Sequence, residues 1–175
     1  MEPLRYDIGV YARPMPGMFH CGDFAATYQG AHHCAVMLID IAGHGYPAYR
    51  IAETLRPILQ SALEASTEVE LRQLPTDLLD LAHCSLQKTR GAAVAALVAD
   101  ANGLVHFTGV GNIRCMVVSR DAQHRISTRQ IPSRDGLVGV RKRRPESCSF
   151  ELGARDLVLL HSDGVGSSMG SWKVP

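Results

Sequence analysis

The sequence predicts an α+β fold in which two largely antiparallel sheets stack on each other and helices cover them from outside. The first observation is the order of the elements: apolar runs of strand length, two helical patterns, and then many short strands in hairpin order. The second is that both faces of Ala92–Ala99 and of Leu157–Leu160 are apolar, so each strand needs cover on both sides. A single domain of 175 residues is long enough to bury such a core.

The N-terminal half predicts a buried strand and then a long helix. Ala35–Ile39 is continuously apolar, which is typical of a strand buried on both faces. Gly45 and Pro47 open the helix, because proline is tolerated in a first turn whose N–H groups have no partner in any case. Pro57 lies inside the helical pattern and is expected to kink or divide the helix. Apolar residues at helical spacing predict one buried stripe: Ile51, Leu55, Ile58, Leu59 and Ala62.

A second helix is expected after Pro75, and strands follow it. The inward face of this helix is formed by Leu78, Leu79, Ala82 and Leu86. The expected strands are Ala92–Ala99, Val105–Thr108, Ile113–Val118, Ile126–Ile131, Ser149–Leu152 and Leu157–Ser162. The tight turn Asp100–Gly103 joins the first two strands as a hairpin, and Gly153–Asp156 joins the last two. Hairpin connections make neighbouring strands antiparallel.

Composition and charge describe a globular protein with no general affinity for nucleic acid or membranes. Hydrophobic residues make up 46% of the chain and charged residues 20%, and 18 basic against 17 acidic residues leave a formal net charge of +1. The longest apolar stretches have about ten residues, too few to span a bilayer, and the N-terminus has no apolar signal core. We therefore expect a cytoplasmic protein. Its five cysteines are widely spaced and are expected to be free thiols.

Aspartates at the ends of apolar runs, beside glycine turns, are the main candidates for function. Asp40 stands in Leu-Ile-Asp-Ile-Ala-Gly-His-Gly, Asp163 stands in Leu-Leu-His-Ser-Asp-Gly, and Asp23 follows a Cys-Gly pair upstream. A rigid strand end and a turn without bulky side chains allow such carboxylates to be directed at one point. Hard cations such as Mg²⁺ and Mn²⁺ prefer oxygen ligands of this kind. The sequence thus indicates a metal-dependent hydrolase acting on phosphate.

Two other interpretations of this region stay open. An aspartate in a turn also accepts backbone hydrogen bonds, so the three carboxylates could be turn caps without a metal. The second interpretation is a zinc site, since zinc could be bound by the soft ligands His20, Cys21, His32, His33, Cys34 and His44. Against it, no pair of these residues has the spacing of a zinc finger, and strand alternation sends His33 and Cys34 to opposite faces.

Five short motifs occur in the order found in a known family. They are Gly22-Asp23, Asp40 with Gly43-His44-Gly45, Thr89-Arg90-Gly91-Ala92-Ala93, Gly109-Val110-Gly111-Asn112-Ile113 and Ser162-Asp163-Gly164. In this order the chain resembles the metal-dependent protein phosphatase (PPM) family, which has the protein phosphatase 2C fold. Within it, the chain is most similar to the SpoIIE-like serine phosphatases of the RsbX type. The resemblance implies an α-β-β-α sandwich in one domain, residues 1–175, with a two-metal centre at one end of the paired sheets.

The resemblance also implies roles for individual residues. Asp40 would bridge two Mn²⁺ or Mg²⁺ ions, the main-chain carbonyl of Ile41 would complete one coordination shell, and Asp163 would bind the second ion. Asp23 would hold a metal-bound water. Two cations about 3.5–4 Å apart lower the pKa of a bridging water and stabilise charge on the phosphoryl oxygens, so no covalent intermediate is needed. His44 would protonate the leaving serine oxygen, or is a surface residue at the start of the helix.

One departure from the family concerns its last metal-binding aspartate. The family usually carries this residue in an Asp-Asp-x-Thr strand beyond a further helix. The sequence has no such element before Pro175, eleven residues past Gly164. We therefore expect a domain without the family's last helix and strand, either as a shortened form or with a weakened second metal site.

The resemblance implies a serine/threonine phosphoprotein phosphatase. Its substrates would be phosphorylated STAS-domain proteins of a bacterial stress-signalling complex, the stressosome, which it would reset after a kinase has acted. One alternative is a phosphatase for a free anti-anti-sigma factor. Another is a non-catalytic pseudophosphatase that has lost its last metal ligand and docks on a STAS-domain partner.

A run of four cations, Arg141, Lys142, Arg143 and Arg144, interrupts the even distribution of charge. It could be a solvated loop. Beside a phosphatase cleft, it would instead bind or steer a phosphorylated or acidic protein substrate. Nucleic acid is the weakest candidate, because no aromatic residues accompany the run to stack on bases.

Overall fold

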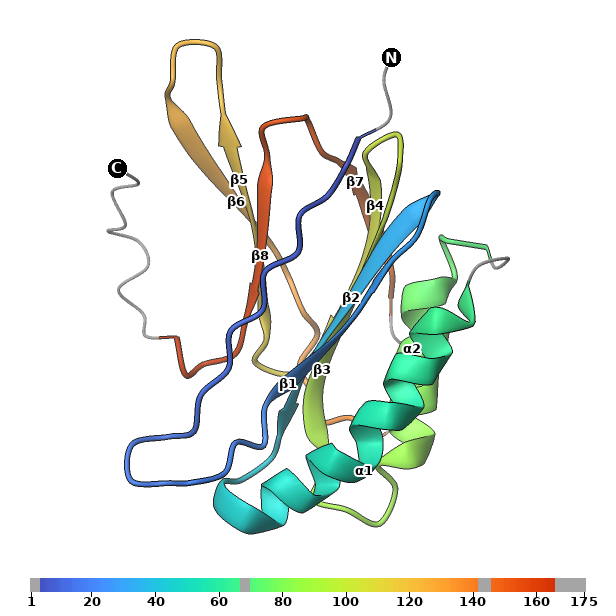
Figure 1. Cartoon of the computed structure of the whole chain (residues 1–175), viewed down its shortest axis with the longest axis vertical. Coiled ribbons are helices and arrows are strands. Elements are labelled where there is room, and N and C mark those ends of the chain that lie inside the picture. The colour runs from blue at the N-terminus through green and yellow to red at the C-terminus, as the bar shows by residue number, and fades with distance from the viewer. Residues whose placement is uncertain (1–3, 67–69, 142–145, 166–175) are drawn as a thin grey trace.

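The structure is a computed structural model that describes residues 4–66, 70–141 and 146–165. These residues form an α+β fold of two helices and two antiparallel sheets, which confirms the predicted fold class (Figure 1). The helices are α1 (Gly45–Glu64) and α2 (Leu74–Ser85). The strands are β1 (Phe24–Gln29), β2 (His33–Ile41), β3 (Ala92–Asp100), β4 (Leu104–Val110), β5 (Arg114–Arg120), β6 (Ile126–Ile131), β7 (Cys148–Glu151) and β8 (Leu157–His161).

The larger sheet has five strands in the order β1-β2-β3-β4-β7, all antiparallel. Its centre is the β2–β3 pair, which runs from His33 opposite Asp100 to Ile41 opposite Ala92. Because side chains alternate along a strand, Ile41 points to one face of this sheet and Asp40 to the other. Ile41 packs in the core on the helix side, whereas Asp40 shares its face with Leu38, which packs against the core between the two sheets.

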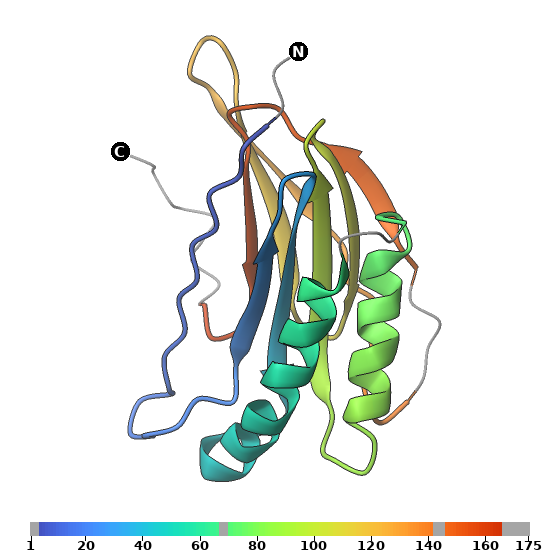
Figure 2. The same cartoon turned by 45° about the vertical axis from the view of Figure 1, so that its right-hand side comes forward.

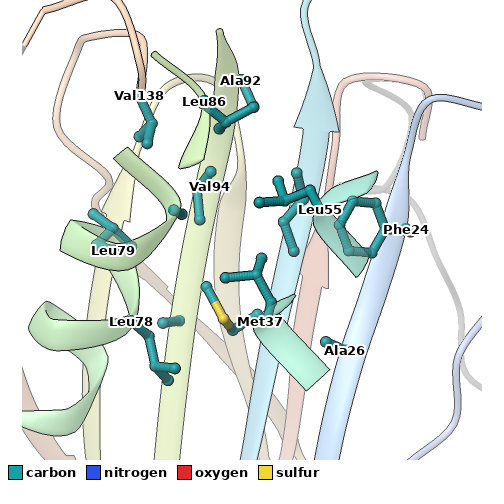
Figure 3. Packing of buried hydrophobic residues seen from close by; sticks show 14 of the residues in the cluster. Phe24, Ala26, Met37, Leu55, Leu78, Leu79, Leu86, Ala92, Val94 and Val138 are labelled. Atoms are coloured by element: carbon teal, nitrogen blue, oxygen red, sulfur yellow. The ribbon is translucent and has the colours of Figure 1, made fainter. Parts of the chain in front are cut away.

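Both helices lie side by side on one face of the five-stranded sheet (Figures 1 and 2). An apolar layer fills the space between helices and sheet (Figure 3), and its members include Phe24, Met37, Leu55, Leu78, Leu79 and Val94. Full burial of one such side chain contributes about 1.5–3 kcal/mol to folding. The predicted inward face of α2 is confirmed, since all four of its residues are buried here.

The predicted stripe of α1 needs one correction. Of its five residues, Leu55 and Leu59 are buried, Ile51 and Ala62 are partly buried against the core, and Ile58 is 40% exposed and does not belong to it. The buried stripe consists of Ala48, Ala52, Leu55, Leu59 and Leu63. Pro57 does not divide α1, which continues through it as one helix. Pro57 is exposed, so water can bond the carbonyl that the missing N–H leaves free.

The smaller sheet has three antiparallel strands in the order β6-β5-β8 and packs against the other face of the five-stranded sheet. Its contribution to the inter-sheet core includes Cys115 and Val117, which meet Leu97 and Phe107 of the larger sheet. β3 is therefore buried on both faces, as its apolar sequence predicts. In the part of the chain that the structure describes, no helix covers the outer face of the smaller sheet.

The predicted strands agree with the structure to within about two residues at each end, but β1 was not among them. The predicted hairpin of the last two strands is wrong, because β7 pairs with β4 in the larger sheet and β8 with β5 in the smaller one. The cysteines of the described chain are free, as predicted. None of the described helices is long and apolar enough to cross a membrane.

Candidate metal centre

Carboxylates from both sheets meet at one end of the sandwich, the lower end in Figure 1. Asp23 immediately precedes β1, and Asp40 is the next-to-last residue of β2. Since Phe24 pairs with Ile39, extending the register by one residue places Asp23 opposite Asp40. Asp163 follows β8 of the smaller sheet by two residues. The three aspartates predicted from the sequence as site residues therefore lie together.

The electrostatics of Asp40 show how close these carboxylates are. Burial, followed by the negative charges of Asp23 and Asp163 and a hydrogen bond with Asp23, raises the pKa of Asp40 to about 7. Each of these causes disfavours a second or third negative charge in the same place. A bound cation would reverse this effect, because it favours the ionised form of every carboxylate around it.

One hydroxyl and one amide side chain donate hydrogen bonds to the carboxylates of Asp23 and Asp163. Ser162 Oγ donates a hydrogen bond of 3.0 Å to Asp23 Oδ2. Asn112 Nδ2 donates a hydrogen bond of 2.7 Å to Asp163 Oδ2. Neither Asn112 nor Ser162 was predicted as a site residue from the sequence. Both could have been found from their places in two of the five motifs, Asn112 next to Gly111 and Ser162 next to Asp163.

Gly111 allows the turn that carries Asn112 to approach the centre of the larger sheet. Its φ is +100°, a conformation that favours glycine, and a Cβ at this position would collide with the Cβ of Ala93. Ala93 pairs with Asp40 across β2 and β3. The turn between β4 and β5 is thereby placed directly beside the Asp40 strand end.

The three aspartates suit Mg²⁺ or Mn²⁺, because these hard cations prefer oxygen ligands and the site offers carboxylate oxygens in a partly buried position. Among the described residues, no three His, Cys, Asp or Glu side chains are already arranged as a metal cluster. Asp23 and Asp163 accept hydrogen bonds from Ser162 and Asn112. Asp23 also shares a hydrogen bond with Asp40. Ile41 ends β2 with its side chain fully buried, so only its main chain is available to the site.

The histidines near the site do not form a zinc centre. His20 stacks on Tyr49, with ring centroids 4.7 Å apart. His33 lies 3.3 Å from Ser66 Oγ on the helix side of the sheet, whereas Cys34 is buried between the two sheets. The two residues thus face opposite sides, as strand alternation predicts. His44 is exposed as the N-cap residue of α1, and its imidazole does not cap the helix.

The predicted basic run is only partly within the structure. Arg141 is exposed and its backbone N–H bonds the carbonyl of Leu137 at 3.3 Å. Lys142, Arg143 and Arg144 lie outside the described residues.

Comparison with known families and structures gives one family match and several related folds. The model of the family "Stage II sporulation protein E (SpoIIE)" matches residues 30–170. No curated protein sequence matches the chain.

Three solved structures illustrate the structural likeness. A chain from "The bacterial stressosome: a modular system that has been adapted to control secondary messenger signaling" is 28% identical, with a TM-score of 0.73 over 94% of this chain and 78% of that chain. RsbX in complex with magnesium is 14% identical, with a TM-score of 0.70 over 89% and 73%. The phosphatase domain of SpoIIE from Bacillus subtilis is 18% identical, with a TM-score of 0.65 over 90% and 46%. The last two likenesses are evidence for the fold alone.

Proposed function

The chain belongs to the SpoIIE family, whose members have the protein phosphatase 2C fold, and we propose that it is a metal-dependent serine/threonine phosphoprotein phosphatase. The observation that carries the proposal is the meeting of Asp23, Asp40 and Asp163 from two different sheets at one end of the sandwich. Mutual repulsion between these carboxylates is unfavourable for folding unless a bound cation or a proton on Asp40 compensates it. This cost supports a cation-binding site over a set of turn caps.

In this proposal the chain's own residues bind and orient. Asp40 would hold Mn²⁺ or Mg²⁺ together with Asp163 and the carbonyl of Ile41, and Asp23 would orient a water. When bound, the cations supply an activated water and neutralise charge on the phosphoryl group. Asn112 and Ser162 fix the directions of two carboxylates. His44, exposed at the start of α1, would give a proton to the leaving serine oxygen.

We propose phosphorylated STAS-domain proteins of a stressosome as the substrates and the cytoplasm as the location. The 28% identity to a chain of a stressosome structure, over most of both chains, supports this choice. A free anti-anti-sigma factor is the alternative substrate. A non-catalytic docking role is a second candidate, and the observation in its favour is that no three His, Cys, Asp or Glu side chains of the described residues are arranged as a metal cluster.

The deciding experiment measures metal binding and turnover on the same protein. Mn²⁺ and Mg²⁺ are titrated by calorimetry, and phosphate release is followed from an aryl phosphate, a phospho-STAS scaffold protein and a phosphorylated anti-anti-sigma factor. We expect metal-dependent release, fastest from the scaffold protein. Binding of metal without release would favour the docking role.

A chelation control separates this centre from a structural zinc site. Carboxylate sites bind dications reversibly, and the two cores here do not involve the aspartates. Chelation is therefore expected to abolish activity with little change in the circular dichroism spectrum. A large loss of secondary structure would indicate a structural metal instead, because removal of such a metal unfolds small domains.

A further inference from the structure

The motif Thr89-Arg90-Gly91 has no role in the proposed function, although the structure places it beside the candidate centre. It connects α2 to β3, whose first residue Ala92 pairs with Ile41. The carbonyl of Gly91 accepts a hydrogen bond of 3.0 Å from the N–H of Ala42. Arg90 is therefore next to the loop that joins Asp40 to α1.

Hydrogen bonds on both sides of Arg90 fix its backbone. Thr89 Oγ1 donates to the carbonyl of Leu86 at 2.6 Å and accepts from the N–H of Gly91 at 3.0 Å. The N–H of Ala92 donates to the carbonyl of Val138 at 3.0 Å. A side chain on so constrained a turn can be presented to a ligand at small entropic cost, because the backbone is already ordered.

The guanidinium of Arg90 lies against Gly43. A Cβ on Gly43 would meet Nη1, the far end of the flexible Arg90 side chain, and Gly43 has a φ of +96°, so the backbone conformation favours glycine here. Gly43 follows Asp40 by three residues, so its Cα lies at most about 11 Å from the Cα of Asp40. The guanidinium of Arg90 thus lies beside the loop that follows Asp40.

No acidic side chain of the described residues forms an ion pair with Arg90. Its side chain is exposed, and within the described ranges it forms neither an ion pair nor a hydrogen bond. A guanidinium donates two parallel N–H groups that match two oxygens of a phosphoryl group. An unpaired cation on an ordered turn, next to the loop that follows Asp40, suits an anion that binds at this end of the sandwich.

We propose that Arg90 binds the phosphoryl group of the substrate, with its guanidinium donating two hydrogen bonds to non-bridging oxygens. The inference rests on the proposed function and adds a binding residue to its site. The same contact would be made with inorganic phosphate, the product. Arg90 would act in binding, since nothing in its position gives it a proton to transfer.

The test compares Arg90→Gln and Arg90→Lys with a matched charge control, Arg120→Gln. Arg120 is exposed and ends β5, whereas the start of β5 is the end near Asn112, so the control removes the same charge far from the site. For each Mn²⁺-loaded protein, the affinity for inorganic phosphate is measured by calorimetry, and kcat and KM are measured with an aryl phosphate. Melting temperature and Mn²⁺ affinity are measured alongside.

Arg90→Gln is expected to weaken phosphate binding and raise KM by about tenfold or more, the scale of a lost hydrogen bond to a charged group. Arg90→Lys should lose less, because it keeps the charge but not the paired donors. Phosphate affinity unchanged within about twofold, or reduced equally by Arg120→Gln, overturns the proposal. A fall in melting temperature or Mn²⁺ affinity at unchanged phosphate affinity also overturns it, in favour of a purely structural role. Absence of turnover in the wild type would count against the proposed function alone, because phosphate binding still tests Arg90.

Discussion

Ser162 donates a 3.0 Å hydrogen bond to Asp23, although 139 positions separate the two residues in the sequence. Ser162 directly follows the last strand of the smaller sheet, and Asp23 directly precedes the first strand of the larger one. This contact links the two sheets at the candidate centre. The orientation of the carboxylate opposite Asp40 therefore depends on the sheet to which Asp40 does not belong.

Removing this link should weaken metal binding while leaving the fold intact. Ser162→Ala removes a hydrogen bond that orients Asp23, and loss of an outer-shell partner of a metal site lowers metal affinity about tenfold to a hundredfold. Calorimetric titration with Mn²⁺ measures the change. Ser127→Ala, an exposed position on β6, is the matched control. Equal affinity of Ser162→Ala and wild type would show that Asp23 needs no such support.

Asp40 should be the position on which activity depends most, because it would contact both cations. Asp40→Asn keeps the shape of the side chain but removes the charge, so hydrolysis of an aryl phosphate is expected to fall at least about a hundredfold. The exposed Asp7→Asn serves as control. If Asp40→Asn kept more than about half of the wild-type turnover, the assignment of the metal site would be wrong.

The stability of the metal-free protein should fall as the pH rises toward neutrality. The pKa of Asp40 is raised from 3.8 to about 7, chiefly by burial and by the charges of Asp23 and Asp163. Between these two values the folded protein keeps a proton that the unfolded chain has released, so the free energy of unfolding decreases with increasing pH. Because Asp40 is only partly buried, solvent screening reduces the full effect, and we expect a loss of about 1–2 kcal/mol.

Urea unfolding at pH 5 and pH 8, with chelator present, measures this loss. Asp40→Asn has no such group to titrate, so its free energy of unfolding should change less with pH than that of the wild type. The difference between the two proteins removes the contribution of all other titrating groups. The same pH dependence in both would contradict the raised pKa of Asp40.

The basic run should affect recognition of a protein substrate but not the chemical step. Replacing Arg141, Lys142, Arg143 and Arg144 with serine is expected to leave aryl phosphate hydrolysis nearly unchanged and to slow dephosphorylation of a phospho-STAS protein. The deficit should shrink at high salt, because screening already weakens steering in the wild type. Equal losses on both substrates would mean that the run supports the metal centre, and no loss on either would leave it a solvated loop.

The fold could be predicted where the sequence pattern itself demands burial. β3 is apolar and buried on both faces, and α2 has a clear apolar face, so their places follow from their own residues. β8 is also apolar, but the expected cover on both faces is wrong for the described residues, where β8 is only partly buried and Leu157 is 60% exposed. β1 has a mixed sequence, Phe-Ala-Ala-Thr-Tyr-Gln, and is a strand because it pairs with β2 along its whole length. Ile58 shows the same limit, since helical spacing placed both Ile58 and Leu59 on the buried stripe, and only Leu59 is buried.

The aspartates of the candidate site could be predicted from the sequence, but the side chains that donate hydrogen bonds to them could not. Glycine turns at strand ends mark Asp40 and Asp163 in the sequence. The hydrogen bond from Asn112 to Asp163 joins residues 51 positions apart, and it depends on how the turn between β4 and β5 meets the end of β8. The place of Arg90 likewise follows from the β2–β3 register, which brings its turn to the loop after Asp40.

The small residues of β3 have a consequence for the metal centre. Ala93 and Ala95 face the smaller sheet and lie in the inter-sheet core, so their size helps to set the thickness of that core. The candidate ligands come from both sheets, and that thickness therefore sets the separation of their carboxylates. Extra methyl groups in a packed core are accommodated by backbone shifts that cost about 1–3 kcal/mol. Two cations tolerate little change in their ligand spacing. A larger side chain at Ala95 would thus widen the gap between Asp40 and Asp163 and weaken metal binding before it unfolded the protein.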